Sequence, residues 1–397
     1  MIVAPLDGLV VVELATVLMA PYASQMLGDL GADVIKVESG HLDASRVMGR
    51  GPHPQLSGIA LNLHRNKRSI QLDLRQPDGL TAIGRLLTKA DVFITNLRPS
   101  ALTRLSLHYD AVKNGRPSLI YCESHGFRAS SPEGERPAFD DIIQAETGVP
   151  QLPTAIGEPV HFAPMLLADK LVGVMICNAV LAALVGRSAS GAGGHIEVPM
   201  FDALLAFNLV EHMAGATVAG GDAGYSRILT HHRGPHRTVD GYVALLPYSD
   251  ENWKALYQAV GREDELELPW FRDRPTRNLN ADKVYASLAD VVSQRTTSEW
   301  LQICGDLNVP VAPVPSLGEI IADPKLHRGA IEELVHPVAG PYRSIVPAAK
   351  FDGCDTPVRR PAPLVGQHTI EVLTDVGYTA AEISGMLDRG AATQSDG

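Results

Sequence analysis

The residue whose type and position are best suited to covalent chemistry is an aspartate that opens a long apolar helix. Asp169 follows Ala168 and stands at the start of a segment that we expect to be helical, Asp169–Val185. Backbone N–H groups at a helix start favour negative charge, so we expect this carboxylate to be ionised. An ionised carboxylate can attack an activated acyl group and form a covalent intermediate. Aspartate is also a common N-cap residue, and on the residues alone capping is the more usual role.

Three histidines form a second group of side chains that could do chemistry. His231, His232 and His236 include a spacing of four, which would suit two metal ligands on one face of a helix. Gly234 and Pro235 interrupt any such helix. We therefore expect no metal site there, and instead either a loop that faces the substrate or a solvated turn.

Composition and charge limit the classes of protein to consider. The chain has 397 residues, of which 45% are hydrophobic and 20% charged, as in a globular protein of two domains. Its formal net charge of −11 disfavours a broad nucleic-acid surface. The four cysteines form no C-x-x-C pair, which favours a reduced, cytoplasmic protein. The apolar stretch Leu171–Val185 is too short to cross a membrane, and Met1–Val12 lacks a signal-peptide pattern, so we expect no membrane partner.

Strands and helices alternate in the first part of the chain and must position these side chains. β-branched apolar runs predict strands at Leu9–Leu14, Asp33–Glu38, Ser69–Leu74, Asp91–Thr95 and Leu119–Glu123, with helices at Pro21–Leu30 and Asp78–Lys89. This alternation predicts a Rossmann-like open parallel α/β sheet, whose ligands bind past the carboxyl ends of the strands. Neither a G-x-G-x-x-G nor a P-loop sequence is present, which disfavours a nicotinamide enzyme or a P-loop ATPase.

The rest of the chain predicts a second, smaller domain and a returning segment. We expect a strand at His195–Val198, helices at Phe201–Ala214, Glu251–Val260 and Asn280–Thr296, and a hairpin with its turn at Asp240-Gly241. Glycines near 220 indicate a linker. We therefore expect a large domain at 1–216, a linker and small α+β domain at 217–325, and a linker with a C-terminal segment at 326–397 that returns to the large domain. The small polar tail Ala391–Gly397 favours disorder.

Motifs spread along nearly the whole chain resemble those of class III CoA-transferases, the CaiB/BaiF type that includes formyl-CoA transferase and carnitine CoA-transferase. The motifs are Pro5–Gly8, Gly31–Glu38, Asn66–Leu74, Asn96–Pro99 with Arg104, Ala168-Asp169 after Pro164, Asp240–Tyr242, Asn252-Trp253 and Pro363–His368. They occur in the order found in that family, which makes the resemblance specific.

The resemblance implies a two-domain protomer, an interlocked homodimer and a set of site residues. Asp169 would be the nucleophile, and Asp140 would lie close to it, although a capping role for Asp140 is as plausible. The implied CoA-binding residues are Leu72, Arg75, Asn96, Leu97, Arg98 and Arg104. Leu72 could equally be a core residue, and Arg104 a surface residue. Coenzyme A or acyl-CoA would be a substrate, and no cofactor or metal would be bound permanently.

The implied reaction moves CoA from an acyl-CoA donor to a carboxylic acid through an aspartyl mixed anhydride and an aspartyl-CoA thioester. Arg227, Arg233 and Arg237 could hold a second carboxylate, which favours a dicarboxylic acid with succinyl-CoA as donor. Leu18 stands where formyl-CoA transferase has a glutamine, which weakens an assignment to oxalate.

Two other functions remain open. The first is an α-methylacyl-CoA racemase, which needs a proton-transfer pair. The family supplies a histidine to that pair where this chain has Phe139, and phenylalanine cannot move a proton. The second is a non-catalytic acyl-CoA binding protein, which the retention of Asp169 disfavours.

Overall fold

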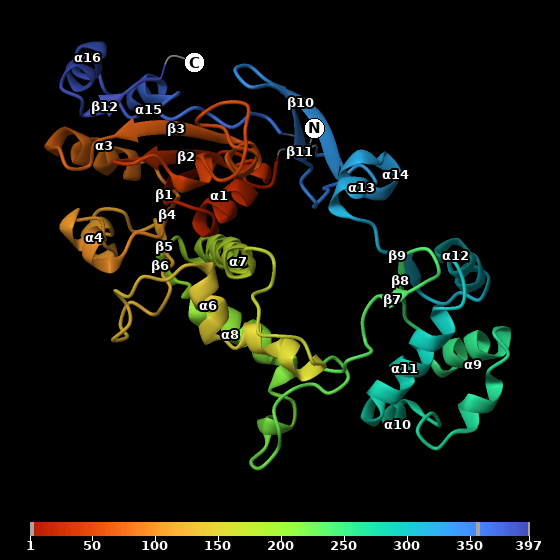
Figure 1. The fold of residues 1–397 in the computed structure, drawn as a ribbon. Coiled ribbons are helices and arrows are strands. Elements are labelled where there is room, and N and C mark those ends of the chain that lie inside the picture. Colours follow the sequence, from red (N-terminus) through yellow and green to blue (C-terminus); the bar gives the residue numbers. More distant parts are fainter. Residues whose placement is uncertain (1–3, 355–357, 396–397) are drawn as a thin grey trace. The chain divides into compact units, whose positions relative to one another are not determined.

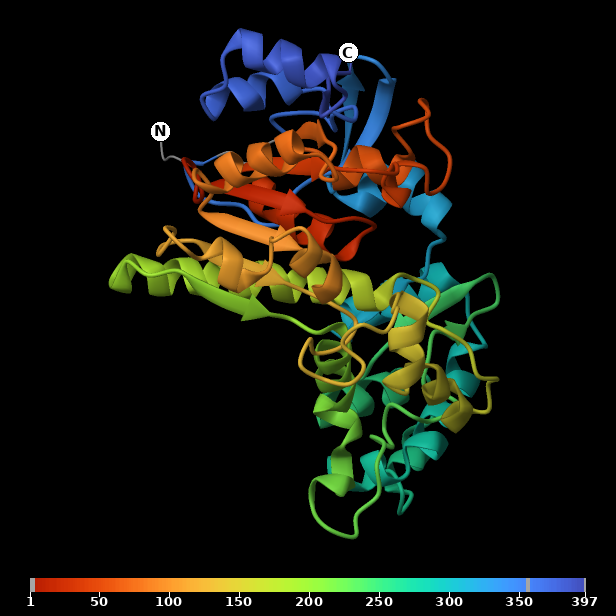
Figure 2. The same ribbon diagram turned by 90° about the vertical axis from the view of Figure 1, so that its left-hand side faces the viewer.

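The computed structural model describes residues 4–354 and 358–395 and divides the chain into two compact units. The larger unit comprises Met1–Thr147, Pro164–Leu205 and His327–Gly397, and the smaller unit comprises Gly148–Ala163 and Ala206–Leu326. Figures 1 and 2 show the chain coloured along its sequence. Residues 1–3, 355–357 and 396–397, which belong to the predicted first and last domains, lie outside the described residues. The domain bounds 1–216, 217–325 and 326–397 stay a prediction.

A seven-stranded sheet forms the centre of the larger unit, in the order β12-β3-β2-β1-β4-β5-β6. Six of its strands are parallel, and β12 pairs with β3 in the antiparallel direction. The strands are β1 (Val10–Leu14), β2 (Asp33–Glu38), β3 (Lys67–Leu72), β4 (Val92–Thr95), β5 (Ile120–Glu123), β6 (Gly194–Glu197) and β12 (Ala392–Thr393). The predicted mixed α/β fold with a large, mainly parallel sheet is therefore confirmed.

Nine α-helices lie wholly within the described residues of the larger unit. They are α1 (Met19–Asp29), α2 (Gly58–Leu63), α3 (Pro77–Leu87), α4 (Pro99–Arg104), α5 (Tyr109–Val112), α6 (Asp140–Glu146), α7 (Leu167–Ser190), α15 (Thr369–Asp375) and α16 (Ala380–Asp388). In α3, Ile83, Leu86 and Leu87 are buried against the strands, as an amphipathic helix requires. Gly31 ends α1 with φ 112°, and a Cβ there would lie 2.5 Å from the Cβ of Ala4.

The C-terminal segment differs from its prediction at the tail. Residues Ala392 and Thr393 form β12 beside β3, so the expectation of disorder is wrong for these two residues. Val372, Leu373 and Met386 join the same apolar cluster as the strands, which fixes α15 and α16 on this sheet (blue in Figure 1). The segment also contains an antiparallel hairpin, β10 (Ile331–His336) and β11 (Gly340–Ile345), which the sequence analysis did not predict.

The smaller unit has a separate apolar core. Its antiparallel sheet has the order β7-β8-β9, with β7 (His236–Arg237), β8 (Tyr242–Leu245) and β9 (Val311–Pro313). Trp253, Tyr257, Phe271 and Trp300 pack in the core beneath helices. The helices are α9 (Asp250–Ala259), α10 (Arg274–Leu279), α11 (Ala281–Val292), α12 (Thr297–Asp306), α13 (Leu317–Ala322) and α14 (Pro324–His327), and the chain enters this unit along α8 (Met200–His212).

Helix α7 is longer than the sequence predicted, and by length and composition alone it could cross a membrane. Its mean hydropathy over the most apolar window is 1.8, and 39% of that window is buried inside the protein. A core helix of a globular protein has the same properties, so one such helix is weak evidence for a membrane span. Val172, Ile176 and Val180 are fully buried, which agrees with a core helix.

Candidate active site

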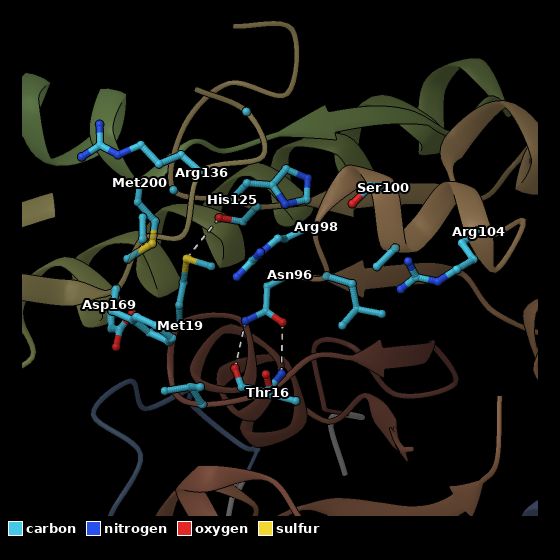
Figure 3. Close-up of a pocket in the computed structure, with 18 residues that line it drawn as sticks. Thr16, Met19, Asn96, Arg98, Ser100, Arg104, His125, Arg136, Asp169 and Met200 are labelled. Atoms are coloured by element: carbon cyan, nitrogen blue, oxygen red, sulfur yellow. Dashed lines mark hydrogen bonds between the residues drawn. The ribbon is translucent and has the colours of Figure 1, made fainter. Parts of the chain in front are cut away.

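A cavity of about 510 Å³ lies in the larger unit where β1, β4 and β5 end. The starts of α7 and α8 supply Asp169 and Met200 to its wall. Figure 3 shows the side chains that line it, with Asp169 and Arg104 on opposite sides of the view. The position agrees with the rule that ligands of a parallel sheet bind beyond the carboxyl ends of its strands.

Asp169 lies in the first turn of α7 and is 8% exposed. The N-cap of α7 is Leu166, so the expected alternative role of Asp169 as the N-cap residue is wrong. Burial, together with the negative charge of Asp140, raises the pKa of the Asp169 carboxyl from 3.8 to about 7. Burial and the like charge of Asp140 thus oppose the helix start, which was expected to hold this carboxylate in its ionised form.

Asp140 supports the start of α7 from a neighbouring helix. Its Oδ1 accepts a hydrogen bond of 3.0 Å from the backbone N–H of Asp169, and its Oδ2 accepts one of 2.5 Å from Nε2 of Gln144. The two roles that the sequence left open thus coincide: Asp140 caps a first-turn N–H of α7 and lies beside the candidate nucleophile.

The turn between β1 and α1 forms another wall of the cavity. Asn96 holds it with two hydrogen bonds, accepting from the N–H of Thr16 at 3.1 Å and donating to its carbonyl at 2.9 Å (Figure 3). Oδ1 of Asp43 accepts from the N–H of Val17 at 2.9 Å. Val17 has φ 68°, a conformation that a β-branched residue rarely adopts, so these contacts stabilise an otherwise unfavourable turn.

A second cavity of about 270 Å³ in the same unit shares Thr16, Leu97, Ala101 and Arg104 with the first. The two cavities together bring most of the predicted CoA-binding residues to one place. Asn96, Leu97, Arg98 and Arg104 line the first cavity, and Arg75, Leu97 and Arg104 line the second.

The arginines among these residues differ in whether they already form an ion pair within the protein. Arg98 and Arg104 are exposed and form no ion pair with any of the described residues. Arg75 is exposed and forms an ion pair with Asp73 at 2.9 Å. Leu72 is 1% exposed within the apolar cluster of the sheet and lines neither cavity. The structure thus places Leu72 in the core, which was its expected alternative, and its role at the CoA site stays a prediction.

A fully buried ionic network supports the sheet below this site. Glu13 accepts hydrogen bonds of 2.8 Å from Lys36 and from Lys67, and Lys36 also pairs with Asp43 at 2.9 Å. Although burial raises the pKa of the Glu13 carboxyl, the two ammonium groups outweigh it and lower that pKa to about 2. Burial and the neighbouring Lys36 lower the pKa of the Lys67 ammonium group to about 8. The network joins the first three parallel strands at the base of the β1–α1 turn.

Several residues of the cavity wall were not predicted from the sequence, among them His125, Arg136 and Met200. Arg136 forms an ion pair with Glu146 and lies 4.9 Å from the ring of Phe127. The available signal was the position of His125, two residues beyond β5, because the carboxyl ends of all strands in a parallel sheet face the ligand.

The histidines singled out from the sequence lie in the smaller unit. Nδ1 of His231 lies 2.7 Å from the carbonyl of Ile156, and Nδ1 of His232 lies 2.9 Å from Asp282. In the part of the chain that the structure describes, no group of three or more histidine, cysteine, aspartate or glutamate side chains could hold a metal ion.

The site thus combines a buried carboxylate with exposed arginines at the ligand-binding edge of a mainly parallel α/β sheet. Residues 6–369 match the sequence model of CoA-transferase family III, and the chain belongs to this family. The chain is therefore an enzyme of the CoA-transferase class, and CoA thioesters are its substrates.

Individual proteins agree with this membership. The chain is 28% identical to human succinyl-CoA:glutarate CoA-transferase over 99% of this chain and 91% of that protein. It is 31% identical to acetyl-CoA:oxalate CoA-transferase of Acetobacter aceti, over 90% and 92% of the two chains. The crystal structure of a CAIB/BAIF family protein from Brucella suis is similar with a TM-score of 0.78 and 27% identity, covering 94% of this chain and 100% of that one.

Proposed function

We propose that the chain transfers CoA from an acyl-CoA donor to a carboxylic acid with Asp169 as the nucleophile. The Asp169 carboxylate attacks the donor thioester carbonyl, forming a mixed anhydride and releasing CoA thiolate. The thiolate then attacks the Asp169 carbonyl, which releases the donor acid and leaves an aspartyl-CoA thioester. The acceptor carboxylate attacks this thioester and displaces the thiolate again. The thiolate finally attacks the acceptor carbonyl of the new anhydride, which yields acceptor-CoA and restores the Asp169 carboxylate.

The burial of Asp169 in the wall of the cavity is the observation that carries this proposal. A buried carboxylate is poorly solvated, which makes it a stronger nucleophile when it is ionised. The raised pKa also shows that the surroundings penalise its negative charge, so forming a neutral anhydride or thioester relieves that penalty. Four covalent steps then need only one protein side chain as the acyl carrier.

The same cavities provide charge for the phosphate groups of CoA. Arg98 and Arg104 are the exposed arginines without an ion-pair partner among the described residues of the two walls. Arginine binds phosphate oxygens through two parallel hydrogen bonds. We propose that these two residues bind CoA phosphates, with Arg75, Asn96 and Leu97 beside them. In this assignment the thioester end of the substrate extends to Asp169.

We propose succinyl-CoA as the donor and a dicarboxylic acid as the acceptor. The sequence of the human relative, whose printed name specifies succinyl-CoA and glutarate, aligns with nearly the whole chain. A further relative is named for acetyl-CoA and oxalate, so oxalate is the acceptor to compare. Initial rates with purified protein, succinyl-CoA and either glutarate, oxalate or a monocarboxylic acid of similar length measure this preference. A higher kcat/KM for the monocarboxylic acid would contradict the dicarboxylate assignment.

Trapping of the acylated aspartate tests the mechanism. Incubation with succinyl-CoA and then hydroxylamine converts an activated Asp169 into its hydroxamate, which peptide mass spectrometry locates. Borohydride reduces an aspartyl thioester at the same residue to an alcohol. Asp169→Asn serves as the matched control and yields neither product. Unmodified Asp169 in the wild-type protein, with α-proton exchange into deuterated water, would instead identify a racemase.

We also propose that the protein is a cytoplasmic, interlocked homodimer. Helix α7 exposes Val174, Met175 and Val185, whose exposed fractions are 48%, 38% and 72%. Large apolar side chains on the exposed part of a helix favour contact with another protein surface. Sedimentation velocity measures the mass directly: a dimer is expected, and a species of 42.5 kDa at micromolar concentration would contradict it.

A further inference from the structure

A histidine in the wall of the cavity has no hydrogen-bond partner for either ring nitrogen. The side chain of His125 is 3% exposed, and neither Nδ1 nor Nε2 forms a hydrogen bond with any described residue. Burying a polar group without a partner costs free energy, so nearly all such groups in folded proteins have one. His125 lines the same cavity as Asp169, which makes a substrate the available partner.

Two neighbouring side chains fix the charge beside His125. Nε2 of His125 lies 3.6 Å from Oε2 of Glu123, and Nε2 of His195 lies 2.9 Å from Oε1 of the same carboxylate. The ring of His195 stacks on Tyr109 with centroids 4.7 Å apart and an interplanar angle of 12°. Although burial acts in the opposite direction, the two histidines lower the pKa of Glu123 to about 2, so its carboxylate stays ionised. The hydrogen bond that Glu123 accepts raises the pKa of the His195 imidazole.

The backbone holds His125 at this position. Its carbonyl accepts a hydrogen bond of 2.8 Å from the N–H of Met200, and the carbonyl of Gly126 accepts one of 2.9 Å from the N–H of Phe201. Both donors lie in the first turn of α8. The loop that carries the histidine is thus anchored to a helix start, whereas its imidazole is held by no hydrogen bond among the described residues.

The charges around Asp169 explain why a cation is needed there. Asp169 and Asp140 lie in contact, and the proposed reaction adds the carboxylate of the acid to the same cavity. Of the arginines in the wall, Arg136 is neutralised by Glu146, and the proposed function assigns Arg98 and Arg104 to CoA phosphates. His125 is the remaining group in the described wall that can become positively charged.

We propose that His125 binds the carboxylate of the acid acceptor in the cavity through a ring N–H, and that Glu123 and His195 position it. This inference rests on the proposed function, since it assigns the acceptor subsite of the same reaction. The N–H donates a charge-assisted hydrogen bond to the carboxylate.

Separate measurement of the two half-reactions tests the role of His125. Succinyl-CoA alone reports formation of the aspartyl-CoA thioester through release of succinate, and glutarate added in the full assay reports acceptor binding. In His125→Leu we expect the KM for glutarate to rise about tenfold to a hundredfold, because one hydrogen bond to a charged group is lost. The release of succinate from succinyl-CoA is expected to stay within about twofold of the wild type. An unchanged KM for glutarate, or an equal fall in both half-reactions, would overturn the proposal.

A matched pair of variants at His195 tests the positioning role. Both remove the stacking on Tyr109, but in His195→Gln the amide N–H can still donate to Glu123, whereas in His195→Leu it cannot. We expect the KM for glutarate to rise in the leucine variant and to recover at least partly in the glutamine variant, with kcat changing less than KM. Equal KM values in the two variants would refute the proposal that His195 positions His125 through Glu123. Wild-type protein that never acylates Asp169 would refute the proposed function itself, independently of these variants.

Discussion

The contact between Asp140 and Asp169 makes a quantitative prediction about the pH dependence of the reaction. The acid limb of kcat/KM reports ionisation of groups in the free enzyme. Asp169 has to be ionised to attack, so in the wild type we expect kcat/KM for succinyl-CoA to rise with pH until about pH 7. Asp140→Asn removes the negative charge but keeps an oxygen that can accept from the N–H of Asp169.

The size of the shift follows from the two causes that raise the pKa. The pKa of Asp169 increases from 3.8 to about 7, burial is the larger cause, and the charge of Asp140 is the smaller one. Asp140 therefore accounts for less than half of the change, at most about 1.5 pH units or about 2 kcal/mol. In Asp140→Asn we expect the acid limb to move down by about 0.5 to 1.5 units, and no further, because burial is unchanged.

Rate profiles between pH 5 and 9, with succinyl-CoA at concentrations well below KM, measure this shift. Asp141→Asn is the matched control, since Asp141 is the next residue of α6, is exposed and lines neither cavity. It is expected to leave the limb in place. If the limb of Asp140→Asn stays within about 0.3 units of the wild type, or moves to higher pH, the assigned electrostatic coupling is refuted.

Stability measurements provide an independent sign check. A carboxyl whose pKa is raised on folding binds more protons in the folded state, so its contribution to stability is lost as pH rises from about 4 to 7. Asp140→Asn reduces this loss. The difference in the free energy of unfolding, variant minus wild type, is therefore expected to be more positive at pH 8 than at pH 4.

Three further changes test the support of the site. Lys67→Met removes one partner of the buried Glu13, so we expect it to lower the free energy of unfolding by about 3 kcal/mol in urea titrations. The control Lys89→Met changes an exposed lysine and should alter this free energy by less than about 0.5 kcal/mol. Equal effects of the two substitutions would contradict a stabilising role of the buried network. Arg104→Ala should raise the KM for acyl-CoA about tenfold or more, because an arginine that binds phosphate is lost. The KM of the wild type should also rise with salt concentration. A KM of the variant within twofold of the wild-type value would argue against phosphate binding by Arg104. Gly126→Ala places a Cβ 2.3 Å from the Cβ of Ala138, which forces the segment before Asp140 to move. We therefore expect kcat to fall at least about tenfold. An unaltered kcat would show that this close packing is not needed for the reaction.

The local elements of the larger unit could be predicted because their signals are local. Asp33–Glu38 forms β2 at the predicted bounds, and β1, β4 and β5 each begin one residue later than predicted. Buried strands of a parallel sheet are continuous apolar runs, which are visible without any neighbour. Strand β3 begins two residues earlier than predicted, at Lys67, because buried charge partners allow a lysine inside the sheet.

Features that depend on distant pairing escaped prediction. The two residues of β12 carry no strand signal and form a strand because β3 offers an open edge 320 positions earlier in the chain, where Ala392 pairs with Leu72. His125 belongs to none of the sequence motifs, and it became a candidate site residue because its buried ring nitrogens form no hydrogen bond with the described residues. Asp140 was expected near Asp169 only through the family resemblance, and its hydrogen bond to the helix start became visible in the structure.

The sequence by itself determined the order of strands and helices and, through the resemblance of its motifs to a family, the choice of Asp169 as the candidate nucleophile, because patterns and motifs are properties of the residues along the chain. Only the tertiary structure decided how that carboxylate titrates and which side chains surround it. The physical reason is that burial and charge interactions depend on distance in space: Asp140 stands 29 positions from Asp169 in the chain, yet its carboxylate accepts a hydrogen bond of 3.0 Å from the N–H of that residue.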